Sequence, residues 1–143
     1  MPFFSKTLAV TASRSVIAKT NLGLYIAVFL AFAIGVAHSV LGERYILMRL
    51  FRRNNLPKLF GGTEFTTRTL RFAWHLTTVA WWGLGAIILL LARQSLSFRS
   101  VSWVVAVTFL VSSVIALVAS RGRHLSWIAF LAIGGLCLAA AVS

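Results

Sequence analysis

Four long stretches of this chain carry no Asp, Glu, Lys or Arg, and each is about as long as a bilayer is thick. Roughly 20 apolar residues suffice for a helix to cross the hydrocarbon core. Lipid cannot satisfy backbone polar groups, so crossing segments form helices that hydrogen-bond internally. The sequence therefore predicts an all-α integral membrane bundle of four transmembrane helices. The helices are expected at about residues 22–42, 72–92, 100–120 and 124–142, within one domain over residues 22–143.

Composition excludes a water-soluble protein. Hydrophobic residues make up 59% of the chain and charged residues 11%, and the mean hydropathy is +0.91. Soluble domains carry about 25% charged residues. A soluble fold of 143 residues has too little interior to hide so much apolar surface.

Two segments that flank the first helix are expected to lie outside the spans. Residues 1–21 are too polar to cross, and they fit either a short helix on the membrane surface or a disordered tail. Residues 43–71 form a basic first loop, in which an amphipathic interfacial helix is expected from Arg44 to Arg53. The residues expected to break that helix are Asn54, Asn55 and Pro57.

The second helix is expected to begin inside this loop and to enter lipid near Phe72. Thr63 is its expected N-cap and Glu64 lies in its first turn. Arg68 follows Glu64 at the spacing of a helical ion pair.

Basic residues in the connections predict the orientation, because Lys and Arg accumulate on the cytoplasmic side. The first loop carries seven, and Arg121 and Arg123 add two on the same side, which makes nine. The N-terminal segment carries three and the second loop two, which makes five. We therefore expect the first loop in the cytoplasm and both termini outside.

The net charge of +12 points to lipid rather than to nucleic acid, because the cations flank membrane spans and concentrate on one side. Each such cation is worth about 1 kcal/mol near an anionic membrane surface. Anionic head groups are therefore the expected partner, and no nucleic acid is expected. The expected head-group contacts are Arg44, Arg49, Arg52, Arg53, Lys58 and Arg68.

Helix order brings the three histidines to one face of the membrane. His38 and Glu43 lie at the end of the first helix, while His75 and His124 lie at the starts of the second and fourth. In helices that alternate up and down, these ends share one leaflet, so the histidines are expected beside both acidic residues.

Helical periodicity predicts how two of the histidines meet. His38 is in register with Gly35 and Gly42, and small residues let a second helix approach closely. On the second helix, the most polar stripe contains Arg71, His75, Thr78 and Trp82. If the two stripes pack together, His38 and His75 become neighbours.

Two metal-based roles remain open for the histidines. His38 and His75 have the placement of axial ligands for a haem b held between helices. Alternatively, His38, His75 and His124, with Glu43, are ligands that a transition metal such as zinc, copper or iron accepts.

An amphiphile site and a purely structural role also remain open. A quinone or lipid would bond through Arg71, His75 and Thr78 and place its tail against Trp82. In the structural alternative, each histidine bonds a nearby hydroxyl or carbonyl, or lies at head-group level. The ligand-binding candidates are thus His38, Glu43, Arg71, His75, Thr78 and Trp82, and the metal or haem candidates are His38, His75 and His124.

The strings HSVLGERYILMRLFRR and TRTLRFAWHLTTVAWWG, within residues 38–83, resemble a group of small multi-pass bacterial inner-membrane proteins. The shared motifs are H-S-x-L-G-E-R and W-H-L-T. This resemblance implies location in the bacterial inner membrane and implies no reaction. The residues that it marks for testing are His38, Ser39, Gly42, Glu43, Trp74 and His75.

A second likeness is to the membrane-associated eicosanoid and glutathione metabolism family, which also has four helices and a basic segment after the first. Glu43-Arg44 followed by Arg52-Arg53-Asn54-Asn55 is similar to that family's acid, arginine and asparagine pattern. The second acidic residue that follows the asparagine in that family is absent here, and the Trp-His pair has no counterpart there.

The polar inventory favours a binding role. No acidic residue lies inside a predicted span, so a hydrolase triad or carboxylate pair is poorly supported. We expect a binding or accessory subunit with a polar site between the first two helices, acting with other membrane subunits or as a homo-oligomer. The alternative is a haem- or quinone-binding redox protein, whose cofactor would supply the chemistry.

Overall fold

The computed structural model describes residues 3–53 and 55–143, with side chains described from Asn21 onward apart from residue 54. Its named elements are all helical, which confirms the all-α class. In chain order they are α1 (Phe3–Leu41), the π-helix η1 (Gly42–Leu47), α2 (Met48–Phe51), α3 (Glu64–Ala92), α4 (Phe98–Ser120) and α5 (Ser126–Val142).

Three helical segments in the described part of the chain are long and apolar enough to cross a membrane. They are Asn21–Phe51, Glu64–Ala92 and Phe98–Ser120. The fourth apolar helix, α5, has only 17 residues. At a rise of about 1.5 Å per residue it is about 25 Å long, slightly less than a hydrocarbon core of about 30 Å.

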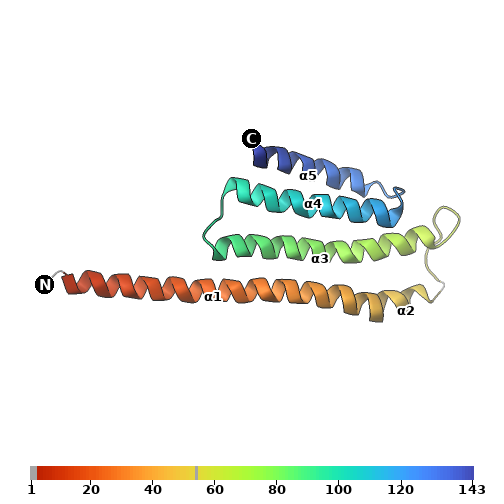
Figure 1. Cartoon of the computed structure of the whole chain (residues 1–143). Helices are drawn as coiled ribbons and strands as arrows, with labels where there is room; N and C mark the ends of the chain where they lie inside the picture. The colour runs from red at the N-terminus through yellow and green to blue at the C-terminus, as the bar shows by residue number, and fades with distance from the viewer. Residues whose placement is uncertain (1–2, 54) are drawn as a thin grey trace.

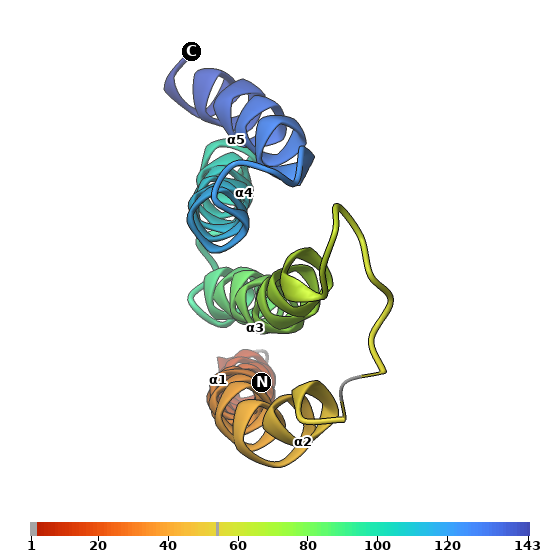
Figure 2. The same ribbon diagram turned by 90° about the vertical axis from the view of Figure 1, so that its right-hand side faces the viewer.

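The helices lie in a single row rather than in the closed bundle that the sequence led us to expect. α1 packs on α3, α3 on α4, and α4 on α5. Figure 1 shows this order from the side, and Figure 2 shows the same row viewed along the helix axes. Association of helices in lipid depends on local close packing, not on a hydrophobic drive to enclose a core, so a row of neighbours satisfies it.

Small and hydroxyl-bearing side chains make the contacts within the row. Buried residues include Ala106 and Ala116, and in the described chain no large side chain is fully buried. Gly83 lies against Thr108, and Gly134 lies against Leu110. Ser113 donates a hydrogen bond from Oγ to the Trp127 carbonyl at 2.7 Å, joining α4 to α5.

The basic first loop is shorter than predicted, because its first third belongs to the first helix. α1 continues through η1 and α2 as far as Phe51, so no separate interfacial helix forms between Arg44 and Arg53. Arginine side chains can lay their apolar stems along a helix while the charge stays at the surface. Asn55 and Pro57 are in non-helical backbone, and the predicted break at Asn54 lies outside the described residues.

The N-terminal segment also joins the first helix. The backbone from Phe3 onward is continuous with the span, in place of the separate segment expected over residues 1–21. Residues 3–20 contain neither Gly nor Pro, the residues that most readily interrupt a helix.

α3 begins where its start signals predict. Thr63 precedes the first residue, Glu64, although the Thr63 side chain makes no capping hydrogen bond. Arg68 pairs with Glu64 across one turn, at 2.6 Å.

α5 starts at Ser126, two residues later than predicted, and its N-cap is Leu125. The His124 Nδ1 atom accepts a hydrogen bond from the Ser126 backbone N–H at 3.3 Å. Before it, α4 ends in a left-handed turn at Arg121 (φ 52°) and Gly122 (φ 75°).

Candidate functional site between α1 and α3

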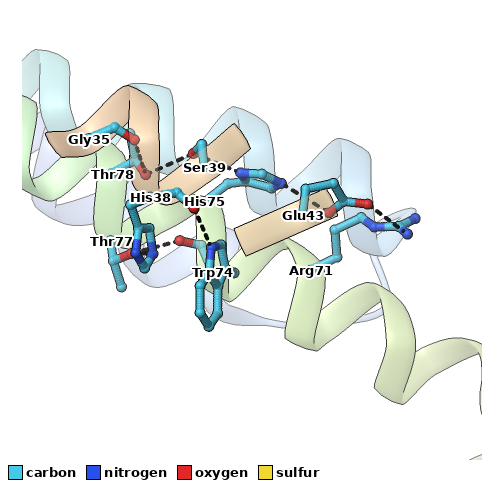
Figure 3. Close-up of polar contacts among 9 residues, drawn as sticks. All are labelled: Gly35, His38, Ser39, Glu43, Arg71, Trp74, His75, Thr77 and Thr78. Atoms are coloured by element: carbon cyan, nitrogen blue, oxygen red, sulfur yellow. Dashed lines mark hydrogen bonds and ion pairs between the residues drawn. The ribbon is translucent and has the colours of Figure 1, made fainter. Parts of the chain in front are cut away.

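A line of polar side chains runs along the contact between α1 and α3 (Figure 3). Thr78 Oγ1 donates to the Gly35 carbonyl at 3.3 Å and lies 2.8 Å from Ser39 Oγ. Ser39 Oγ lies 3.0 Å from His75 Nδ1, and His75 Nε2 lies 3.5 Å from Glu43 Oε2. The polar stripe of α3 therefore packs on the first helix through Gly35, Ser39 and Glu43, and not through His38.

The hydrogen bonds of this line require a hydrogen on Nδ1 of the His75 ring. Thr78 uses its hydroxyl hydrogen for the Gly35 carbonyl, so Ser39 donates to Thr78 and accepts from His75 Nδ1. The other ring nitrogen, Nε2, faces Glu43. From the middle of the α1–α3 contact towards its loop end, the groups in contact are therefore two hydroxyls, the His75 imidazole and the Glu43 carboxylate. We name Thr78, Ser39, His75 and Glu43 the inner polar line.

Glu43 occupies the end of the line, and its two oxygens differ. Oε1 pairs with the Arg71 guanidinium at 3.0 Å. Oε2 is buried and accepts no hydrogen bond from any described residue, and its 3.5 Å contact with His75 is too long for a good one. A buried acceptor left without a donor costs about 1–3 kcal/mol. This oxygen can therefore accept a hydrogen bond from a water molecule or from a ligand donor.

A π-helical turn carries Glu43. η1 covers Gly42–Leu47, directly after the end of α1. Single π-turns inside α-helices occur frequently at functional sites, because the wider turn re-aims side chains. Gly42 is buried here, and its Cα lies against the Trp74 indole, where a Cβ would overlap the ring. The turn therefore brings the carboxylate to α3 at a point of very close helix approach.

His38 faces away from the inner polar line. Its ring is stacked on the Trp74 indole, with centroids 4.4 Å apart and planes 3° from parallel, and Trp81 lies 4.8 Å away at 59°. Trp74 Nε1 donates to the His38 carbonyl at 3.1 Å. Thr77 Oγ1 donates its hydrogen to the Trp74 carbonyl at 2.6 Å, so it accepts from His38 Nε2 at 2.8 Å. Figure 3 shows His38 and Trp74 beside each other, apart from Glu43 and Arg71.

The two histidines are therefore neighbours along the helices but not partners across a shared space. His75 directs both ring nitrogens to side chains of α1, and His38 uses Nε2 for Thr77. Holding a haem between them would require both rings to turn and these contacts to break.

His124 lies at the same end of the row but in different surroundings. Its ring packs against Phe65 and Phe72, with centroids 6.0 and 5.2 Å away, and Nδ1 lies 2.8 Å from Ser126 Oγ. The expected group of three histidines and Glu43 does not form. Among the described residues, no group of three His, Cys, Asp or Glu side chains is arranged to hold a metal ion.

The other candidates serve the contact between helices. Thr78 is buried, and Trp82 covers Gly35 and donates from Nε1 to the Phe32 carbonyl at 3.3 Å. Arg71 lies at the outer end of the polar line, and its guanidinium also lies over the Phe51 ring at 5.1 Å. A ligand head group held by Arg71, His75 and Thr78 together is not supported, because Thr78 and His75 already bond to α1.

The expected lipid-contacting cations all lie at the loop end of the row. Arg44 and Arg49 lie over the Tyr45 ring, 5.8 and 5.9 Å from its centre, and both are exposed. Arg68 is held by Glu64. The exposed cations on the connection between α2 and α3 are Arg52, Arg53 and Lys58.

Two hydroxyls of the site were absent from the sequence-based list of ligand-binding candidates. Ser39, which the resemblance marked for testing without a role, joins Thr78 to His75, and Thr77 hydrogen-bonds to His38. A signal for Ser39 exists in its spacing, since it lies four residues after Gly35 and four before Glu43, on one helix face. Thr77 carries no such signal.

Comparison with protein-family models, with curated proteins and with solved structures found no match to this chain. The chemistry of the site is therefore argued from its geometry. Ser39, His75 and Glu43 have the order of a hydroxyl, a base and an acid, but Ser39 lies within a helix contact and its hydroxyl is shared with Thr78. What the line can do is hold α1 on α3 and accept a donor at Glu43 Oε2.

Proposed function

We propose that this protein is a small multi-pass protein of the bacterial inner membrane that acts as a binding or accessory subunit. Its site is the loop end of the α1–α3 contact, where Glu43, His75 and Arg71 meet. In this proposal α5 makes a fourth crossing, the basic loop is cytoplasmic, and both termini are outside. The nine-to-five distribution of basic residues supports that orientation.

The observation that carries the proposal is the half-satisfied Glu43 carboxylate. Arg71 holds Oε1, while Oε2 is buried without a hydrogen-bond donor from the described residues. Ionisable groups at membrane depth are expensive and commonly mark functional sites. The position of this carboxylate is fixed by a π-turn and by the close contact of Gly42 with α3, whereas a simple surface ion pair needs neither.

The chain offers a matched control, because it contains only two acidic residues. Glu43 and Glu64 each pair with an arginine, but Glu43–Arg71 joins two elements and Glu64–Arg68 lies within one helix. We would purify full-length wild type, Glu43→Gln, His75→Gln and Glu64→Gln from bacterial membranes in mild detergent. Bound lipid, quinone and metal would be quantified, and the size of the native complex would be measured.

The proposal expects Glu43→Gln and His75→Gln to change the bound molecules or the complex size, and Glu64→Gln to match wild type. Circular dichroism and a single elution peak would establish that each variant is folded. Folded Glu43→Gln and His75→Gln proteins with wild-type composition and size would overturn the proposal.

A quinone-binding redox protein is the second candidate, favoured by the aromatic surroundings of His38. Its ring lies between two indoles, in a groove that also contains Tyr45. This function predicts near-stoichiometric quinone in wild type and its loss in His38→Ala. The absorption spectrum of the same preparations tests the haem alternative. Preparations without quinone or haem, from cells rich in both, would exclude this candidate.

A further inference from the structure

A groove runs along the outer side of the α1–α3 contact, on the side of His38. Its volume is about 360 Å³, and its lining from α1 and η1 extends from Ile34 to Ile46. Twelve residues of helix at about 1.5 Å each give a length of about 18 Å. The lining side chains beside His38 are chiefly apolar or aromatic, including Leu41, Trp74 and Trp81.

Charge is concentrated at one end of this groove. Tyr45 lines the loop end, and the guanidinium groups of Arg44 and Arg49 both lie over its ring. Neither Arg44 nor Arg49 forms an ion pair within the described part of the chain, whereas Arg68 and Arg71 are each paired with a glutamate. The groove thus has an apolar lining along its length and, at its loop end, two cations that are unpaired in the described chain, Arg44 and Arg49.

We propose that this groove binds one anionic phospholipid, with an acyl chain along Leu41 and Trp81 and the phosphate between Arg44 and Arg49. The complementarity of charge and the position of the cations at the loop end carry the assignment. A quinone fits less well, because it carries no negative charge to pair with Arg44 and Arg49. His38 also offers it no donor, since Nε2–H is donated to Thr77 and Nδ1 is left as an acceptor.

The inference rests on the proposed function only for placing the loop end in the cytoplasmic leaflet, where anionic lipid lies. It concerns a different surface from Glu43. The two proposals therefore fail separately, since Glu43→Gln tests the first and leaves the groove intact.

The test is native mass spectrometry of the full-length protein in mild detergent, titrated with phosphatidylglycerol or phosphatidylcholine of the same acyl chains. Arg44→Gln/Arg49→Gln removes the proposed phosphate contacts. Arg52→Gln/Arg53→Gln removes the same charge from the exposed connection and is the matched control. Ala37→Leu fills the groove without changing charge.

We expect wild type to prefer phosphatidylglycerol and the Arg44, Arg49 pair variant to bind it about thirtyfold more weakly. The Arg52, Arg53 pair variant is expected to stay within about threefold of wild type, and Ala37→Leu to lose binding of both lipids. Equal losses in the two arginine pairs would show charge attraction without a site and overturn the proposal. So would equal binding of both lipids by wild type, or loss of co-purified quinone from Ala37→Leu with phosphatidylglycerol binding unchanged.

Discussion

Gly42, the first residue of the π-turn, leaves room for the indole ring of Trp74, which a Cβ at position 42 would overlap. The same indole donates its N–H to the His38 carbonyl, so its position is fixed by a hydrogen bond as well as by packing. A side chain at position 42 and the indole in its present place exclude each other. Helix α1 can approach α3 this closely only because residue 42 is a glycine.

This contact predicts that Gly42→Ala destabilises the protein although alanine is the better helix former. Overpacking of a tight contact costs about 1–3 kcal/mol, which outweighs a helix-propensity gain of about 1 kcal/mol. Gly23→Ala is the control, because a Cβ added at Gly23 would meet no atom of the described chain within 4 Å. Unfolding in detergent mixtures, followed by circular dichroism, should show loss for Gly42→Ala and no loss for Gly23→Ala. Equal stability of the two variants would show that the Gly42–Trp74 contact is not tight enough to exclude a Cβ.

The hydroxyl pair Ser39 and Thr78 should be energetically coupled. Their oxygens are 2.8 Å apart and belong to different helices, and interhelical hydrogen bonds in membranes average about 0.6 kcal/mol. A double-mutant cycle with Ser39→Ala and Thr78→Val is expected to give a coupling energy of about 0.5–1.5 kcal/mol. Ser112 donates to the carbonyl of its own helix at Thr108, so Ser39→Ala and Ser112→Ala should be additive. Additivity of Ser39→Ala with Thr78→Val would show that the hydroxyl contact carries no stability.

Arg71 should protect the connection that follows α2 from proteolysis. It holds Glu43 of η1 and lies over Phe51 at the end of α2, so it joins both to α3. Arg71→Gln is expected to speed trypsin cleavage after Arg52 and Arg53 several-fold, because the end of α2 then opens more often. Arg68→Gln, which breaks a pair within one helix, should leave the rate unchanged. Equal cleavage rates in both variants would show that Arg71 does not anchor α2.

The orientation and the crossing of α5 can be measured together by cysteine labelling. With Cys137→Ala as background, single cysteines would replace Lys58, Gln94, Gly122 or Ser143 in separate variants. In intact bacterial protoplasts, an impermeant maleimide should label positions 94 and 143 and spare 58 and 122. Labelling of positions 58 and 122 but not of 94 and 143 would show that the protein has the opposite orientation. Labelling of 122 and 143 alike would show that α5 does not cross.

The sequence indicated which faces of α1 and α3 could meet, because both helices carry polar or small residues in register. Gly35 and Gly42 on one helix, with His75 and Thr78 on the other, could be placed from helical periodicity alone. The link that Ser39 makes between Thr78 and His75 was not predicted, although the spacing of Ser39 places it on the same face. Thr77 carries no signal that separates it from other hydroxyls in helices. The rotation of His38 towards Trp74 depends on side-chain packing that no spacing encodes.

The row arrangement could not be predicted from apolar patterning. In lipid, a face that packs on another helix and a face that meets acyl chains are both apolar, so α4 and α5 carry no stripe that separates them. The extension of the first helix to Phe51 was missed for a different reason. The mixture of arginine and apolar residues from Arg44 to Arg53 predicted a separate interfacial helix, although the same pattern is compatible with a continuing helix.

A row one helix thick has a consequence for permeation. Four helices in a closed ring can surround a pore, whereas in the described part of this chain the main contacts of each helix are with its neighbours along the row. The described helices of one copy therefore do not surround a central channel (Figure 2). In a bilayer, both broad sides of the row would face lipid, so molecules dissolved in the membrane would reach α3 and α4 by lateral diffusion. Permeation would require several copies to close around a common axis.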